Sequence, residues 1–201
     1  MTLANLATLI LLIAAFLVGL WLMIPYLYGL PWVPTRYQRI RKALDMAKLR
    51  PGEVLFDLGA GDGRVLIIAA REYQAQAVGI EISGGLCLLA WLRARFNHLS
   101  GQVTIKQANF YKTDLQNADV VFAYMTSGQA PRLRPHLESQ LKAGARVVTI
   151  SFDMEGWQPD AIDDKNLVFL YNMPATKGDV SSYMLQKLIR EQGITQAERN
   201  Q

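Results

Sequence analysis

The chain has 201 residues, enough for one domain of ordinary size and a short appendage. It is 51% hydrophobic and 19% charged, with a formal net charge of +4, and is therefore more apolar than an average soluble domain. Its single cysteine, Cys87, excludes an internal disulfide, and an apolar helical setting favours packing over nucleophilic chemistry. His98 and His136 lack acidic or cysteine neighbours at ligand spacing, so no metal site is expected.

The N-terminal segment accounts for the apolar composition. No charged side chain precedes Arg36, and Leu6–Ile24 is almost continuously apolar. A helix of that length rises roughly 28 Å, about the thickness of the hydrocarbon core of a bilayer. The aromatic residues near its end resemble an interfacial belt; they are Trp21, Tyr26, Tyr28 and Trp32.

Three interpretations of this segment compete. A signal peptide has a basic start, a shorter apolar core and a cleavage site, whereas no charged residue precedes the long apolar run of this chain. A buried soluble helix rarely runs so far without a polar face. The sequence therefore predicts an uncleaved transmembrane anchor over residues 1–30.

A basic patch follows the apolar segment and consists of Arg36, Arg39, Arg41 and Lys42. By the positive-inside rule it places the C-terminal domain in the cytoplasm, at the inner membrane if the source is bacterial. The patch carries much of the net charge, and attraction to anionic lipid explains it better than nucleic-acid binding. No nucleic-acid partner is expected.

The remaining chain alternates apolar strands with helices. Thr35 is expected to cap a helix over Arg36–Leu49. The predicted strands are Val54–Phe56, Gln76–Ile82, Val103–Gln107, Ala118–Met125, Arg146–Phe152, Leu167–Asn172 and Tyr183–Leu188. The later predicted helices are Gly63–Tyr73, Ser83–Asn97 and Pro131–Leu141. This alternation predicts an α/β fold with a doubly wound, mostly parallel sheet over residues 51–190. Residues 31–50 form a preceding segment and helix, and residues 191–201 a polar tail.

The most informative motif lies between the first strand and its helix. Val54–Arg64 reads as an apolar strand, an acidic residue (Asp57) and a turn with glycine at alternate positions. Glycine lets a backbone approach a ligand closely. Dinucleotide sites use G-x-G-x-x-G, whereas this turn has G-x-G-x-G with an acid before it, which does not favour a pyrophosphate.

A second acid, Glu81, ends the second predicted strand. A carboxylate there is placed to accept both ribose hydroxyls of an adenosine. The alternative is that Asp57 and Glu81 are ordinary strand-end charges and the glycines only close a turn. The combination of motif and distance favours a nucleoside site.

These motifs resemble motif I and the following acidic position of class I S-adenosylmethionine-dependent methyltransferases. The likeness extends to the segments Pro31–Thr35, Asp57–Arg64, Gly79–Ile82, Tyr124–Met125, Gly144–Phe152 and Gly156–Pro159, in that order. Together they resemble the family of membrane-anchored lysine methyltransferases that includes the mitochondrial enzyme modifying the ATP synthase c subunit. The resemblance implies a Rossmann-like seven-stranded sheet closed by an antiparallel hairpin.

The resemblance also implies S-adenosylmethionine as cofactor, held by Asp57, Gly59, Ala60, Gly61, Gly63, Glu81, Asn109 and Phe110. Two positions depart from the pattern. Asn109 stands where many class I enzymes have an Asp near the adenine amino group, and Met125–Gly128 replaces an apolar, proline-containing stretch after Tyr124.

On the substrate side, Tyr124, Pro34 and Thr35 are the expected catalytic residues. Aromatic faces attract an amine by cation–π contact, and Trp32 and Trp157 are alternatives with equally plausible roles as interface anchor and packing residue. Two prolines fix the backbone of Pro31–Thr35 more than a linker needs, although a rigid spacer remains open. The expected partner is a protein with an accessible lysine, at or near the membrane. The alternatives are methylation of a lipid-soluble small molecule and cofactor binding without turnover.

Overall fold

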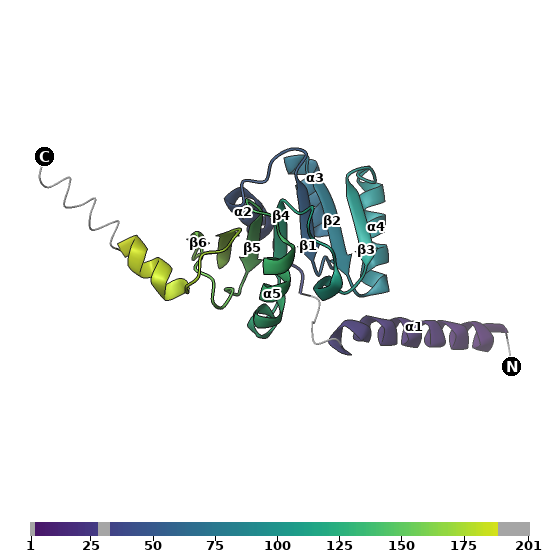
Figure 1. The fold of residues 1–201 in the computed structure, drawn as a ribbon. Coiled ribbons are helices and arrows are strands. Elements are labelled where there is room, and N and C mark those ends of the chain that lie inside the picture. Colours follow the sequence, from purple (N-terminus) through teal and green to yellow (C-terminus); the bar gives the residue numbers. More distant parts are fainter. Residues whose placement is uncertain (1–2, 28–32, 189–201) are drawn as a thin grey trace, which may run out of the picture.

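The computed structural model describes residues 3–27 and 33–188 (Figure 1). The chain begins with a long helix, α1 (Leu3–Leu27), which projects away from the rest of the molecule. Within the described ranges, no helix combines the length and apolar character that crossing a bilayer requires. This finding contradicts the predicted transmembrane anchor, which rested on the apolar run counted in the sequence alone.

The sheet has seven strands in the order β3-β2-β1-β4-β5-β7-β6. The five parallel strands are β1 (Val54–Leu58), β2 (Gln76–Glu81), β3 (Val103–Gln107), β4 (Val120–Tyr124) and β5 (Arg146–Ile150). Strand β7 (Val168–Asn172) runs antiparallel to β5 and also pairs with the short strand β6 (Ala161–Asp163). The predicted Rossmann-like, mostly parallel sheet is therefore confirmed, but its closing antiparallel pair consists of β6 and β7 and not of the two strands predicted for it.

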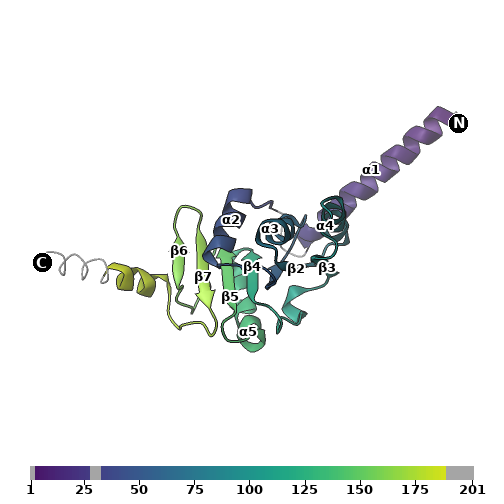
Figure 2. The ribbon, with the colours of Figure 1, turned by 90° about the horizontal axis from the view of Figure 1, so that it is seen from above.

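The helices divide between the two faces of the sheet (Figure 2). Three of them cover one face: α2 (Tyr37–Met46), α3 (Arg64–Tyr73) and α4 (Gly84–Phe96). The other face is covered by α5 (Ala130–Gln140), and short 3-10 turns occur at Phe110–Lys112 and Ser127–Gln129. Each face packs a separate apolar cluster, with Leu44 and Leu66 in the first and Leu133 and Leu137 in the second.

Two local predictions are wrong. Residues 180–188 form a helix, although a strand was predicted over Tyr183–Leu188. The sheet reaches seven strands through the short strand β6, which was not predicted. Thr35 does not cap α2, because the N-cap position is Arg36 and no side-chain hydrogen bond caps this helix.

Candidate functional site

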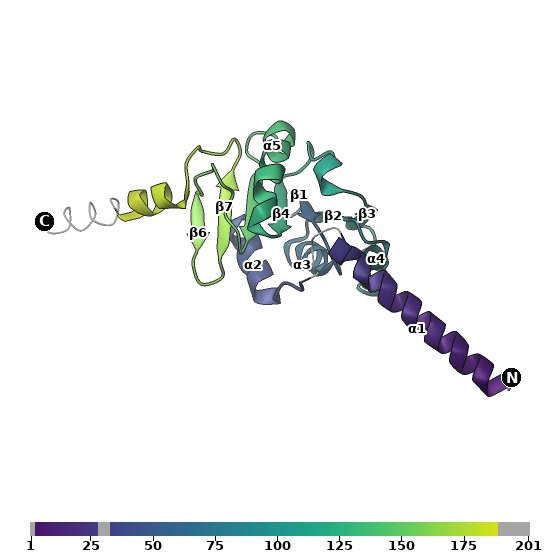
Figure 3. The ribbon, with the colours of Figure 1, turned by 90° about the horizontal axis from the view of Figure 1, so that it is seen from below.

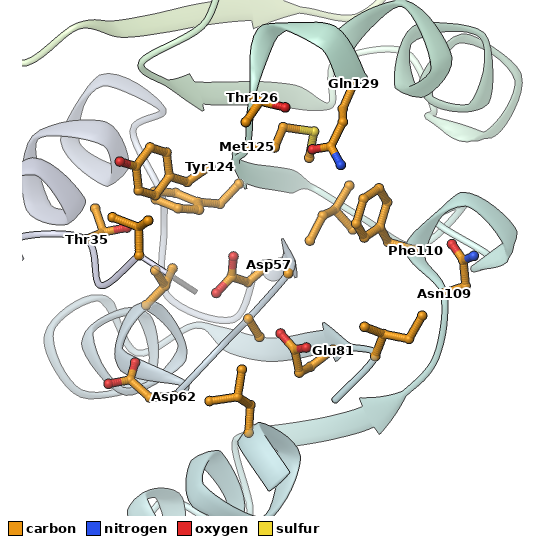
Figure 4. A pocket seen from close by; sticks show the side chains of 18 of the residues that line it. Thr35, Asp57, Asp62, Glu81, Asn109, Phe110, Tyr124, Met125, Thr126 and Gln129 are labelled. Atoms are coloured by element: carbon orange, nitrogen blue, oxygen red, sulfur yellow. The ribbon is translucent and has the colours of Figure 1, made fainter. Parts of the chain in front are cut away.

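A cavity of about 440 Å³ opens at the carboxyl ends of β1, β2 and β4. This is the edge at which open α/β sheets bind ligands. Its lining includes nearly all of the predicted site residues: Pro34, Thr35, Asp57, Gly59, Ala60, Glu81, Asn109, Phe110 and Tyr124. Figure 4 shows Asp57 and Glu81 near the centre of the cavity, with Tyr124 and Phe110 on opposite sides. Gly61 and Gly63 lie in the same turn but not in the lining.

The glycine turn has its shape because of positive backbone angles and close packing. Gly63 has φ of 76°, and a Cβ there would lie 2.8 Å from Cβ of Ala90 in α4. The amides of Gly59 and Ala60 both donate to the carbonyl of Ile80, at 2.8 and 3.0 Å. The turn is therefore fastened to β2 and leaves no room for a larger residue at position 63.

Glu81 joins the turn to the start of α4. One carboxylate oxygen accepts the Gly61 amide and the other accepts the Ser83 amide, each at 2.9 Å. Glu81 is buried, with 7% of its surface exposed. The two backbone amides fix the orientation of the carboxylate, and each oxygen keeps a lone pair for a further donor.

Asp57 is a buried acid of the cavity, with 3% of its surface exposed. Burial raises the pKa of its carboxyl well above the ordinary value, and the negative charges of Glu81 and Asp62 raise it further. A positively charged ligand beside this carboxyl would favour its ionised form and lower the pKa again.

The third acid, Asp62, belongs to a network of arginines. Its carboxylate forms ion pairs with Arg64 and Arg93, each at 2.7 Å. Burial alone would raise the pKa of Asp62, but hydrogen bonds from the two guanidinium groups lower it overall. Arg64 also donates to the carbonyl of Thr35 at 2.9 Å and lies over the ring of Tyr37. The network therefore connects the glycine turn to the segment before α2.

The opposite walls of the cavity are aromatic or amide-bearing. Tyr124 ends β4, and the guanidinium of Arg39 lies 5.8 Å from its ring centre. Asn109 accepts the amide of Tyr111 at 3.0 Å, so its side chain starts the short turn that presents Phe110. Asn109 thus holds a backbone turn and lines the cavity as well.

Of the two aromatic alternatives to Tyr124, Trp157 lies among the described residues and is absent from the cavity lining. Trp157 is 2% exposed, donates to Glu138 at 2.8 Å and packs against Tyr171 in the second apolar cluster. Of the two roles that the sequence left open for Trp157, the structure favours packing over the lining of an amine channel. Pro31 and Trp32 lie outside the described residues.

Several lining residues were not predicted, namely Asp62, Arg64, Leu86, Tyr111, Thr126, Gln129 and Arg132. Asp62 and Arg64 lie within the glycine motif, so the motif itself could have suggested them. Oε1 of Gln129 is buried without a hydrogen-bond partner among the described residues, and Arg132 lies over the Tyr111 ring at 4.3 Å. Neither belongs to a recognisable motif, because only the fold brings the residues after β4 to the cavity.

Cys87 lies in α4 and takes no part in the cavity lining. Burial raises the pKa of its thiol to about 11, with a smaller contribution from Glu81. A thiol that stays protonated at neutral pH is a poor nucleophile, in keeping with the packing role expected from the sequence.

Comparison with known families finds one matching family model, described as the ANTKMT methyltransferase domain, over residues 57–161. A protein-lysine N-methyltransferase from Saccharolobus islandicus is 35% identical over 153 residues, covering 73% of this chain and 95% of the relative. The mouse adenine nucleotide translocase lysine N-methyltransferase is 29% identical over 79% of this chain and 70% of its own length. A mouse lysine N-methyltransferase that is named for the C-type subunit of ATP synthase is 30% identical over 74% of this chain, which spans only 60% of that relative.

Among solved structures, an RNA methyltransferase from Salinibacter ruber in complex with S-adenosyl-L-homocysteine is similar to this chain. It has 35% sequence identity and a TM-score of 0.70, and the match covers 73% of this chain and 97% of the other. The bound molecule in that structure is the demethylated form of a methyl-donor cofactor. The likeness indicates that the cavity of this chain binds the same type of cofactor.

Proposed function

The chain belongs to the ANTKMT methyltransferase family and is an S-adenosylmethionine-dependent protein-lysine N-methyltransferase; from this premise we propose that it methylates a lysine of a membrane or membrane-adjacent protein. The archaeal relative is named for protein-lysine methylation in general. The two mouse relatives are named for the adenine nucleotide translocase and for a component of ATP synthase. These names support a protein acceptor at a membrane.

The residues of the cavity fit the cofactor. Three acids line it (Asp57, Asp62 and Glu81), and Asp62 already has arginine partners. S-adenosylmethionine, when bound, supplies a methyl group on a positively charged sulfur. We assign the ribose hydroxyls to Glu81, whose carboxylate is fixed by two amides, and the positive end of the cofactor to Asp57. Asn109 and Phe110 are assigned to the adenine.

The acceptor side requires a neutral amine. A free lysine has a pKa of about 10.4, so deprotonation at pH 7 costs roughly 4–5 kcal/mol. Desolvation and a nearby positive charge both lower this pKa. We propose that Tyr124, Pro34 and Thr35 receive the lysine and exclude water from it. Since transfer is an in-line displacement, these residues act by positioning.

The contact between Arg64 and the Thr35 carbonyl carries this assignment. It fastens the segment before α2 to the glycine turn, so that Pro34 and Thr35 line the same cavity as Asp57. A spacer with no part in the site would have no need of that attachment. The segment also connects the catalytic domain to α1, whose described side chains include many exposed leucines and isoleucines.

Two other acceptors deserve a direct comparison. An exposed apolar helix would serve a lipid-soluble small molecule as well as a membrane protein. The related Salinibacter structure is named as an RNA methyltransferase, so RNA is included in the test. Turnover itself distinguishes an enzyme from a protein that only holds the cofactor.

In the test, the purified protein is incubated with S-adenosylmethionine labelled on its methyl group and with membranes from a strain that lacks this chain. After incubation, protein, lipid and RNA fractions are separated and the label in each is counted. The proposal expects label in protein, on lysine after hydrolysis, and strongly reduced labelling with the Glu81→Ala variant at limiting cofactor concentration. Label confined to the lipid or RNA fraction would contradict it.

A further inference from the structure

Helix α4 presents an unusually apolar face to solvent. Phe96 is 78% exposed, Leu88 54% and Trp91 48%, and Leu89 is exposed beside them. The helix is anchored by its other side, where Ala90 and Ala94 are buried. A solvent-facing cluster of large apolar side chains on a well-packed helix marks a surface that contacts something else. We call these four residues, Leu88, Leu89, Trp91 and Phe96, the α4 patch.

The charges on α4 are all positive. The helix contains Arg93 and Arg95 and no acidic residue. Arg93 is paired with the buried Asp62, whereas Arg95 is exposed and lies over the Trp91 ring at 5.9 Å. Arg71 reaches the Asn97 side chain at the end of the helix. Tryptophan and phenylalanine combined with exposed arginine form the composition that binds the interface of an anionic bilayer.

The position of α4 adds a second, independent observation. In the views of Figures 1 and 3, α1 leaves the molecule on the same side as α4. Leu9, Leu12 and Phe16 on α1 are exposed as well. One apolar medium on this side would cover both helices, whereas a compact protein partner would have to match two separate surfaces.

We propose that the α4 patch is a docking surface for an anionic lipid bilayer, with Leu88, Trp91 and Phe96 entering the interface and Arg95 meeting lipid phosphates. Leu86 of the same helix lines the cavity. The helix that carries the proposed docking surface therefore also contributes to the cavity wall. The proposal concerns the position of the enzyme and does not depend on which molecule accepts the methyl group.

Because α1 also exposes apolar side chains, vesicle binding of the full chain does not by itself report on α4, and the test must do so. A spin label is attached to Phe96→Cys in a Cys87→Ala background, and cofactor affinity verifies that the labelled protein is folded. The matched control carries the label at Leu185→Cys, since Leu185 is 61% exposed on the helix of residues 180–188. Collision rates with oxygen and with a water-soluble nickel chelate are measured with and without phosphatidylglycerol-containing vesicles.

The proposal expects vesicles to lower the chelate collision rate at position 96 several-fold and to raise that of oxygen, with little change at position 185. A label at 96 that stays open to the chelate while the protein sediments with vesicles would overturn the proposal. Protection at 96 without vesicles, rising with protein concentration, would overturn it in favour of a second copy of the chain. Activity on a soluble peptide is measured separately, so failure of docking is distinguishable from failure of the proposed function.

Discussion

The guanidinium of Arg64 bonds to the backbone carbonyl of Thr35 at 2.9 Å, across 29 positions of sequence. The same guanidinium forms a two-pronged pair with Asp62 in the glycine turn. One side chain therefore fixes the distance between the cofactor side of the cavity and the segment assigned to the acceptor.

Removing this connection should affect turnover more than cofactor binding. In Arg64→Ala the Asp62 carboxylate keeps Arg93 as its partner, so the glycine turn should retain its shape. The Thr35 segment loses its attachment, and misplacement of a positioning group by about 1 Å can cost up to roughly a hundredfold in rate. Single-turnover kinetics on a lysine peptide, with calorimetry of cofactor binding, measures both. Arg41→Ala is the matched control, because Arg41 pairs with Glu72 on the surface; equal effects of the two variants would contradict the assignment.

Pro34 and Thr35 can be tested without disturbing the arginine network. Replacing both by Ala keeps the Thr35 carbonyl that Arg64 binds but removes the side chains that line the cavity. An active-site role predicts a fall in turnover of about tenfold or more with cofactor affinity nearly unchanged. Wild-type turnover on a soluble peptide would leave these residues as a rigid spacer.

Glu81 has a structural role besides the one predicted from sequence. Glu81→Gln keeps a carbonyl for one of the two amides, whereas Glu81→Ala leaves both the Gly61 and Ser83 amides without their acceptor. Loss of charge-assisted bonds to the ribose should lower cofactor affinity about ten- to a hundredfold in both variants. The Ala variant should lose more unfolding free energy than the Gln variant, because it leaves two amides unpaired instead of one, at about 1–3 kcal/mol for each amide. Calorimetry and urea unfolding separate the two effects, and unchanged affinity in both variants would remove Glu81 from the site.

The parts of the fold that the sequence predicted are those with strong local patterns. The strands from Val54 to Ile150 are short apolar runs, except for the alternating Val103–Gln107, and Asp57 and Glu81 follow from their places at strand ends. Strand β6 has three half-buried residues and depends on pairing with β7, so no local pattern reveals it. The helix of residues 180–188 does have a local signal, since Asp179 accepts the Ser182 amide at 2.7 Å as a helix cap would.

The site was predictable only where it coincides with a motif. The contact between Arg64 and Thr35, and the approach of Gln129 to the cavity, join segments that are distant in sequence. Their partners are set by the order of strands in the sheet. A pattern within one segment contains no information about such a contact.

Asp57 provides a prediction in which stability and binding change in opposite directions. Burial, followed by the charges of Glu81 and Asp62, raises the pKa of Asp57 in the folded protein. At a pH between the unfolded aspartate pKa, about 3.9, and the higher folded pKa, the folded state therefore holds a proton that the unfolded chain has released. The stability that this proton provides is complete below the unfolded pKa and is lost as pH rises through the folded pKa.

Asp57→Asn removes this titration and keeps the shape of the side chain. The variant should be more stable than the wild type at neutral pH, and the difference should shrink as the pH falls toward about 4. Its affinity for the positively charged cofactor should fall about tenfold or more. In the wild type, cofactor affinity should rise with pH, because binding favours the ionised carboxylate and releases its proton; the Asn variant should lack this dependence. Urea unfolding and calorimetry in buffers of different ionisation enthalpy measure the two quantities. Cofactor binding by the wild type without proton release at any pH would show that Asp57 does not face the cofactor charge.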